Sequence, residues 1–183
     1  MKRLVFTVAA ALAVVVGAWF FVGPPSSSSV PDGVLEQGDD VPAFEVATLE
    51  GERISSEEFE GKILVLDFWA TWCGPCLVAF PKLENVYARY AEDPDVLFLA
   101  VNTGDDTMEK AQEFAQENPY LFPFVYDIDG TLTPQMVTLG IPTLVIIDQE
   151  GRLVHRQTGY SPSSYETALA TIIDDLRAED SPA

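Results

Sequence analysis

Two cysteines, the only ones in the 183-residue chain, lie three positions apart in the stretch FWATWCGPCLVAF. Pairs with this spacing occur in redox dithiols, zinc sites, haem-attachment sites and structural disulfides. Tetrahedral zinc needs four ligands, and the chain has two cysteines and one histidine, which argues against zinc. Haem attachment needs a histidine directly after the second cysteine, where this chain has Leu77. A structural disulfide would close a very short loop and remove little entropy from the unfolded chain.

The surroundings of the pair suit a redox dithiol. An apolar run at 63–69 is typical of a buried strand, and apolar residues then recur at helical spacing from Cys73 to Tyr90. Pro75 falls in the first turn of that helix, where its missing N–H group is harmless. Cys73 would lie at the helix N-terminus, where free N–H groups and the helix dipole stabilise a thiolate. Cys76 would lie one turn further in, shielded from solvent.

The elements around this junction predict a mixed α/β domain over residues 39–179. Strands are expected at 44–49, 63–69, 96–102, 122–127, 143–148 and 153–159, and helices at 55–61, 73–90, 107–118, 133–140 and 161–179. Strands and helices alternate in the first part, and two strands form a hairpin before the last helix. This order predicts a mixed sheet with helices on both faces.

The motifs resemble the thioredoxin fold. The resemblance is carried by LDFWATWCGPC at 66–76, by Pro81 in the following helix, and by IPT at 141–143 before a strand. The N-terminal apolar run, FPFVYD and LVIIDQEGRLV resemble more narrowly the TlpA/ResA-like branch, whose members are membrane-tethered extracytoplasmic thiol–disulfide oxidoreductases. The fold class implied is α/β: a thioredoxin-like three-layer α/β/α domain with a mixed central sheet, preceded by an N-terminal transmembrane helix.

The resemblance implies a role for each residue of the cysteine motif. Cys73 corresponds to the attacking thiol and Cys76 to the resolving thiol. Trp72 would cover the rim of the site, and Gly74 and Pro75 would tune the redox potential. C-G-P-C resembles the reducing members of the fold, so reduction of partner disulfides is favoured over oxidation.

A second segment is implied to complete the site. Pro142 matches a proline that is cis in the family and faces the disulfide, and Ile141 would offer its backbone to an extended substrate. The family uses no metal or organic cofactor in this reaction, so none is expected.

The chain departs from the ResA-like pattern at two positions. Ala79 stands where these proteins usually carry Glu, and Asp67 stands where they commonly carry Asn. Thioredoxin itself has a buried Asp at the second position. A carboxyl inside an apolar strand is costly to ionise, so the pKa of Asp67 should be raised. We interpret Asp67 as the proton acceptor that ionises Cys76, the alternative being an Asp at a strand edge that reaches water.

Two other activities of the same fold remain as alternatives. A copper metallochaperone would use both cysteines and a distant histidine, here His155, although such proteins normally have three residues between the cysteines; His155 is otherwise expected at the surface. A thiol peroxidase would need Thr and Pro before its cysteine, where this chain has Ala70 and Leu66.

The N-terminus predicts a membrane anchor. Residues 4–22 form a run of 19 residues without a charge, nearly long enough as a helix to cross a bilayer. Lys2 and Arg3 precede it, which places the N-terminus in the cytoplasm and the rest outside. A cleaved signal peptide is the alternative. The expected organisation is an anchor at 1–23, a flexible Pro- and Ser-rich linker at 24–38, the domain at 39–179 and a tail at 180–183.

The charge of the chain limits its partners. It has 29 acidic against 10 basic residues, a net charge of −19 and a pI of about 4.1. Such a surface repels nucleic acid, which is therefore not expected as a partner. The expected partners are disulfide-bearing proteins, with the haem-site cysteines of apocytochrome c as the class that the family suggests. A thiol carrier in the membrane is expected to supply the electrons.

Overall fold

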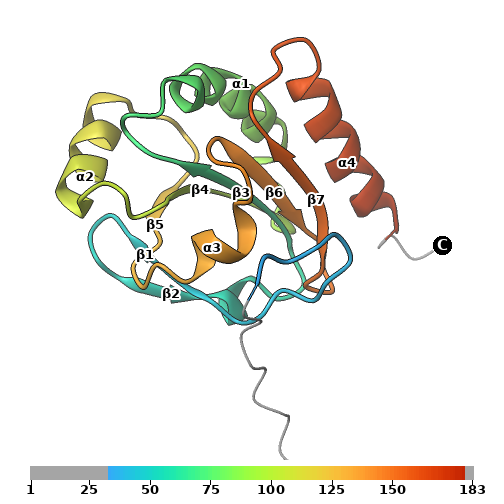
Figure 1. Ribbon diagram of the computed structural model, residues 1–183. Coiled ribbons are helices and arrows are strands. Elements are labelled where there is room, and N and C mark those ends of the chain that lie inside the picture. Colours follow the sequence, from blue (N-terminus) through green and yellow to red (C-terminus); the bar gives the residue numbers. More distant parts are fainter. Residues whose placement is uncertain (1–32, 180–183) are drawn as a thin grey trace, which may run out of the picture.

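A seven-stranded mixed sheet forms the centre of the structure, a computed structural model that describes residues 33–179 (Figure 1). Its strands lie in the order β2-β1-β5-β4-β3-β6-β7. They are β1 (Glu45–Thr48), β2 (Arg53–Ser55), β3 (Ile63–Trp69), β4 (Val96–Asn102), β5 (Phe124–Tyr126), β6 (Thr143–Ile147) and β7 (Leu153–Thr158). β3, β4 and β5 are parallel, while β1, β6 and β7 pair antiparallel with their neighbours. The mixed sheet is the one that the sequence predicts.

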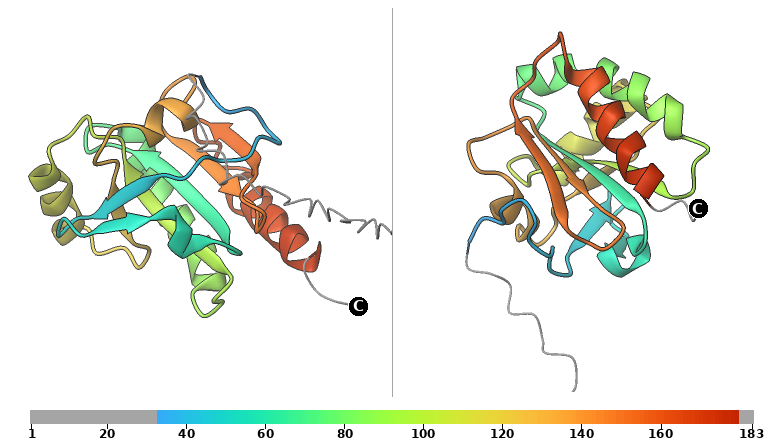
Figure 2. Two further views of the ribbon diagram at one scale, coloured as in Figure 1. Left: turned by 90° about the horizontal axis from the view of Figure 1, so that it is seen from below. Right: turned by 90° about the vertical axis from the view of Figure 1, so that its right-hand side faces the viewer.

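Helices cover both faces of the sheet. They are α1 (Gly74–Tyr90), α2 (Met108–Glu117), α3 (Leu132–Met136) and α4 (Tyr165–Glu179), with a 3₁₀ turn, η1 (Ser56–Phe59), after β2. α1 and α4 pack against each other on one face, and α3 lies on the other (Figures 1 and 2). α2 lies beside β5, where its Phe114 packs against Trp69 and Phe124. The predicted layers are therefore present.

Alternation along β3 divides the core into two clusters. Val65 and Trp69 point toward α1 and α4, whereas Leu64, Leu66 and Phe68 point toward α3. The cluster on the α1 side is rich in aromatic rings, with Phe80 of α1 at its centre. All seven residues of β3 are buried, because helices pack on both of its faces and a strand pairs along each edge.

The domain begins earlier in the chain than predicted. Leu35, placed by the sequence in a flexible linker, is 2% exposed and packs in the cluster on the α3 side. Its N–H group donates to the Gln135 carbonyl at 2.9 Å, and the N–H group of Gly38 donates to the Leu153 carbonyl. Residues 35–38 therefore belong to the folded domain, because Leu35 covers apolar surface that α3 leaves open. The last helix also begins later than predicted, at Tyr165, after a turn over residues 162–164.

The predicted membrane anchor at 1–23 lies outside the described residues. Among residues 33–179, no helix is long and apolar enough to cross a bilayer.

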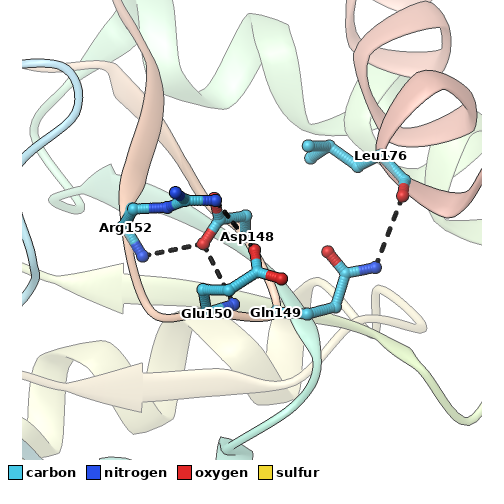
Figure 3. Close-up of polar contacts among 5 residues, drawn as sticks. All are labelled: Asp148, Gln149, Glu150, Arg152 and Leu176. Atoms are coloured by element: carbon cyan, nitrogen blue, oxygen red, sulfur yellow. Dashed lines mark hydrogen bonds and ion pairs between the residues drawn. The ribbon is translucent and has the colours of Figure 1, made fainter. Parts of the chain in front are cut away.

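A tight turn between β6 and β7 holds the far end of the hairpin (Figure 3). The Asp148 carboxylate accepts from the backbone N–H groups of Glu150 and Arg152 at 3.1 and 2.8 Å, and from the Arg152 side chain at 3.0 Å. The Gln149 side chain reaches the Leu176 carbonyl of α4. The turn therefore closes the hairpin that β6 and β7 form and ties it to α4.

Candidate active site

The two cysteines form a disulfide at the N-terminus of α1. β3 ends at Trp69, a short loop follows, and Cys73 caps the helix with Pro75 in its first turn. The Cα atoms of Cys73 and Cys76 are 5.3 Å apart, and the Cys76 N–H group donates to Cys73 Sγ at 3.2 Å. Cys73 is 3% exposed and Cys76 is fully buried. The helix N-terminus therefore presents its N–H groups to the sulfur of Cys73, which favours a thiolate there when the pair is reduced.

Two further parts of the predicted site are Trp72, which directly precedes Cys73, and the segment before β6. The Trp72 side chain is 63% exposed, as expected for a rim residue. The Ile141–Pro142 peptide bond is cis, as the resemblance implies. Thr143 pairs with Phe68, so Pro142 lies at the end of β3 from which the cysteine loop begins. Its carbonyl accepts from the Gly159 N–H group at 2.7 Å, which joins the segment to the end of β7.

Asp67 is buried on the same side of the sheet as the cysteines. It is 1% exposed and lies in one row with Ala100 of β4 and Leu144 of β6. Val65 and Trp69, its neighbours on this face, share a core cluster with Cys73 and Cys76. Neither carboxylate oxygen has a hydrogen-bond partner among the described residues. Burial raises the pKa of Asp67 to about 8, and an Asp that reaches water at a strand edge is excluded.

The other departure from the ResA-like pattern, Ala79, places an apolar side chain in the structure. Ala79 is buried in α1, in the helix that carries the cysteines. Position 79 therefore brings no carboxyl to the buried layer, and Asp67 is the buried acid of the motif.

Asp106 is a site residue that the sequence reasoning missed. Its carboxylate accepts from the Thr71 N–H group at 2.6 Å, from the Thr71 hydroxyl at 2.7 Å and from the Asn102 side chain at 3.0 Å. Burial opposes its ionisation, but the hydrogen bonds from Asn102 and Thr71 outweigh it and hold the pKa of Asp106 below the usual value. Asp106 thereby fixes the loop two residues before Cys73. The sequence feature that could have indicated Asp106 is the polar run that follows β4. Because β3 and β4 are parallel neighbours, their carboxyl ends meet at one edge of the sheet, and this run lies beside the cysteine loop.

His155 lies away from the disulfide. It pairs with Ile146 of β6, which lies three residues after Thr143. His155 is therefore about 10 Å along the strands from the end of the sheet that carries the disulfide. The side chain is half-buried, not at the surface as expected, and burial lowers its pKa. Within residues 33–179, no group of three His, Cys, Asp or Glu side chains could hold a metal ion. The arrangement needed by the metallochaperone alternative is therefore not found in this part of the chain.

Fold and site together define a thiol–disulfide oxidoreductase of the thioredoxin fold, and comparison with known proteins agrees. The sequence matches the redoxin family over residues 36–172. It is 31% identical over 125 residues to the thiol-disulfide oxidoreductase ResA of Bacillus thuringiensis subsp. konkukian, covering 68% of this chain and 71% of the relative. The ResA of Halalkalibacterium halodurans is 29% identical over 153 residues, 84% of each chain. The chain belongs to the redoxin family, with ResA-like relatives.

A solved structure gives the same result. The crystal structure of a Chlorobium tepidum protein assigned as the thiol:disulfide interchange protein DsbE is 30% identical and superimposes with a TM-score of 0.68. The match covers 78% of this chain and 99% of that one. The thioredoxin-like fold expected from the motifs is therefore confirmed.

Proposed function

We propose that this protein is anchored in the cytoplasmic membrane and reduces disulfides of partner proteins on the extracytoplasmic side. The observation that carries the proposal is the Cys73–Cys76 disulfide at the N-terminus of α1, with the buried Asp67 on the same face of the sheet. The orientation toward reduction rests on the resemblance of C-G-P-C to reducing members of the fold.

Reduction proceeds by two exchanges between sulfur atoms. The Cys73 thiolate attacks one sulfur of the substrate disulfide, a mixed disulfide forms, and the other substrate sulfur leaves as a thiolate. Cys76 then attacks Cys73 Sγ, the first substrate sulfur leaves, and the protein disulfide seen in the structure is formed. The substrate gains two electrons, which a membrane thiol carrier must return to Cys73 and Cys76.

Asp67 takes the proton of Cys76 in the second exchange. Cys76 is fully buried, so its thiol cannot lose a proton directly to bulk water. A carboxyl whose pKa is about 8 is close in proton affinity to a free thiol, whose pKa is about 8.5. Asp67 is therefore a much better acceptor for the Cys76 proton than an ordinary carboxylate, and its pKa lies near the operating pH, as suits a general base.

The remaining parts of the site hold the substrate. Trp72 offers an exposed apolar ring at the rim, and Ile141 and Pro142 offer backbone to an extended peptide. Gly74 and Pro75 tune the potential of the pair. The haem-site cysteines of apocytochrome c are the substrate class that the ResA-like resemblance suggests.

Trapping tests this proposal. The Cys76→Ser variant should accumulate a mixed disulfide through Cys73, because the resolving thiol is gone, and mass spectrometry of the trapped complex identifies the partner. The matched control is Cys73→Ser, which should trap nothing and should lose insulin reduction in the presence of dithiothreitol. Insulin reduction that survives in Cys73→Ser would contradict the assignment of the attacking thiol.

A further inference from the structure

Tyr165 carries a second buried polar group on the active-site face that has no partner. It is the first residue of α4, its side chain is 3% exposed, and its hydroxyl makes no hydrogen bond among the described residues. Buried hydroxyl groups are nearly always hydrogen-bonded in folded proteins, so an isolated one needs an explanation. The Asp67 carboxyl, equally buried, lacks a partner as well.

The packing of α4 on α1 brings Tyr165 toward Asp67. Tyr165 belongs to the core cluster that contains Cys73, Cys76 and Trp69, and the Asp67 side chain enters the same layer from β3. Burial raises the pKa of Tyr165 well above its usual value, and the charge of Asp67 raises it further. Both side chains therefore lie buried in the same layer, between β3 and the pair of helices α1 and α4.

The other groups around Asp67 do not supply this contact. Its partners in the sheet, Ala100 and Leu144, are apolar. The indole N–H group of Trp69 is a buried donor that also lacks a partner among the described residues. The Trp69 ring, however, packs against Phe114 and Phe124, toward β5, whereas α4 lies on the side of β7 (Figure 1). The titratable groups that face this layer are Cys73 and Cys76 of α1, joined in the disulfide, Tyr87 and Tyr90 further along α1, Tyr120, Tyr165 of α4 with Tyr160 against its ring, and the half-buried His155 of β7. Lys82 and Glu166 pair with each other further out.

We propose that Tyr165 is a positioning residue for Asp67: its hydroxyl donates a hydrogen bond through one bridging water molecule to the Asp67 carboxylate when that carboxylate is ionised. The inference rests on the proposed role of Asp67 as the base for Cys76. Tyr165 keeps its own proton throughout, since it donates to the anion and does not transfer. When Asp67 takes the proton from Cys76, the bond to Tyr165 changes from charge-assisted to neutral and weakens.

This contact sets the pH range in which the mixed disulfide is resolved. Burial raises the pKa of Asp67. A donor to the ionised form lowers the pKa of a carboxyl, so the proposed hydrogen bond from Tyr165 would oppose the effect of burial. Without the hydroxyl, the pKa of Asp67 rises above its present value and a smaller fraction of the protein holds an ionised base at neutral pH.

The test is Tyr165→Phe in the full chain, with the pKa of Asp67 followed by carbon NMR of its carboxyl group and assigned with Asp67→Asn. We expect the pKa of Asp67 to rise by about one pH unit or more, since a hydrogen bond to a charged group is worth that much. A shift of one unit should slow resolution of the mixed disulfide at pH 7 by about tenfold and should move its pH profile upward by about one pH unit. Tyr165→Leu, which also lacks a donor, carries the same expectation if the Phe variant does not fold.

Tyr90→Phe is the matched control. Tyr90 also lies between α1 and α4, but its hydroxyl donates to the Ala170 carbonyl at 3.1 Å and lies 3.0 Å from the Asp174 carboxylate. Its removal should lower stability and leave the pKa of Asp67 unchanged. An unchanged pKa of Asp67 in Tyr165→Phe, or an equal rise in Tyr90→Phe, would overturn the inference. Unchanged resolution in Asp67→Asn would instead refute the role of Asp67 while leaving the NMR result for Tyr165 intact.

Discussion

At the scale of single residues, the burial of Asp67 links the chemistry of the site to the stability of the fold. The same desolvation that makes this carboxyl basic enough to accept a thiol proton makes it expensive to keep ionised inside the sheet. Apolar residues at this position would pack without that cost. Two consequences follow, one kinetic and one thermodynamic.

The kinetic consequence concerns the resolution step. Asp67→Asn removes the base while preserving the shape of the side chain, so resolution of the mixed disulfide should slow by about 10²-fold, the lower end for general-base assistance. In the wild type, resolution should accelerate as pH rises through about 8, because the ionised fraction of Asp67 grows. Single-turnover kinetics separate this step from the attack by Cys73, which should change little. Resolution at the wild-type rate would mean that the Cys76 proton leaves by another route.

The thermodynamic consequence concerns the free energy of unfolding as a function of pH. The pKa of Asp67 is about 8 in the folded state and about 3.9 in the unfolded chain, so between these values only the unfolded state loses the proton. The wild type is therefore destabilised as pH rises, by about 1.4 kcal/mol per pH unit. Asp67→Asn should gain stability relative to the wild type between pH 4 and pH 7, on the order of 4 kcal/mol. Denaturant melts at both pH values measure this, and a difference that does not grow with pH would contradict the buried, protonated state.

At the scale of elements, the loop between β3 and α1 depends on the loop that follows β4. The Asp106 carboxylate holds Thr71 through its backbone and its hydroxyl, and the Tyr126 hydroxyl donates to the Asp106 carbonyl at 2.5 Å. The cysteine loop is thus fixed by contacts with residues of a different βα connection, which leaves Trp72 exposed and Cys73 at the helix N-terminus.

Asp106→Asn should loosen this loop. The Asn side chain has one acceptor oxygen where the carboxylate accepts three donors, so the expected loss of stability is about 1–3 kcal/mol at neutral pH. The pKa of Asp106 is lower in the folded protein than in the unfolded chain. Its contribution to the free energy of unfolding is therefore complete at pH values above the usual pKa of a carboxyl, and it is lost as pH falls through the lowered pKa. Hydrogen exchange of the Thr71–Cys73 amides should become faster, with α4 unchanged. Asp105→Asn is the control, since the exposed Asp105 accepts only from the Thr103 hydroxyl among the contacts of this loop; an equal effect there would contradict the proposed role of Asp106.

At the scale of the whole molecule, a strongly acidic domain follows a long apolar N-terminal segment. The domain begins by Leu35, only 12 positions after the last residue of the predicted anchor at 1–23, so an uncleaved anchor would hold the active site close to the membrane. Such a position would suit exchange with a thiol carrier in the membrane.

The anchor gives the prediction at this scale. Mass measurement of the protein purified from membranes should show a chain that retains residues 1–23, because the apolar run ends in bulky residues and not in a small-residue cleavage site. Protease added to the outer face of spheroplasts should degrade the domain, with a cytoplasmic protein as the protected control. A soluble product that begins near Gly23 would show a cleaved signal peptide instead.

The sequence alone predicts the features that arise from local pattern. Apolar periodicity predicts β3 as a buried strand and α1 as the helix after it, and the fixed φ of Pro75 suits the first helical turn. The cysteine pair together with its surroundings predicts a redox dithiol, and the resemblance of the motifs to the thioredoxin fold implies that fold. These are properties of neighbouring residues, so they can be read before the chain is folded.

Tertiary structure alone decides what each side chain meets. Leu35 lies in a stretch of mostly polar and small residues with no helical or strand periodicity. Nothing in that stretch indicates that Leu35 is buried in the core cluster on the α3 side. The Thr71–Asp106 contact joins residues 35 positions apart, because β3 and β4 end at the same edge of the sheet. The sequence predicts that the pKa of Asp67 is raised, but the full burial of Asp67 and the placement of Tyr165 in the same layer arise only when α1 and α4 pack together over β3 and exclude water. Desolvation depends on every element that covers a group, and no single stretch of sequence contains that information.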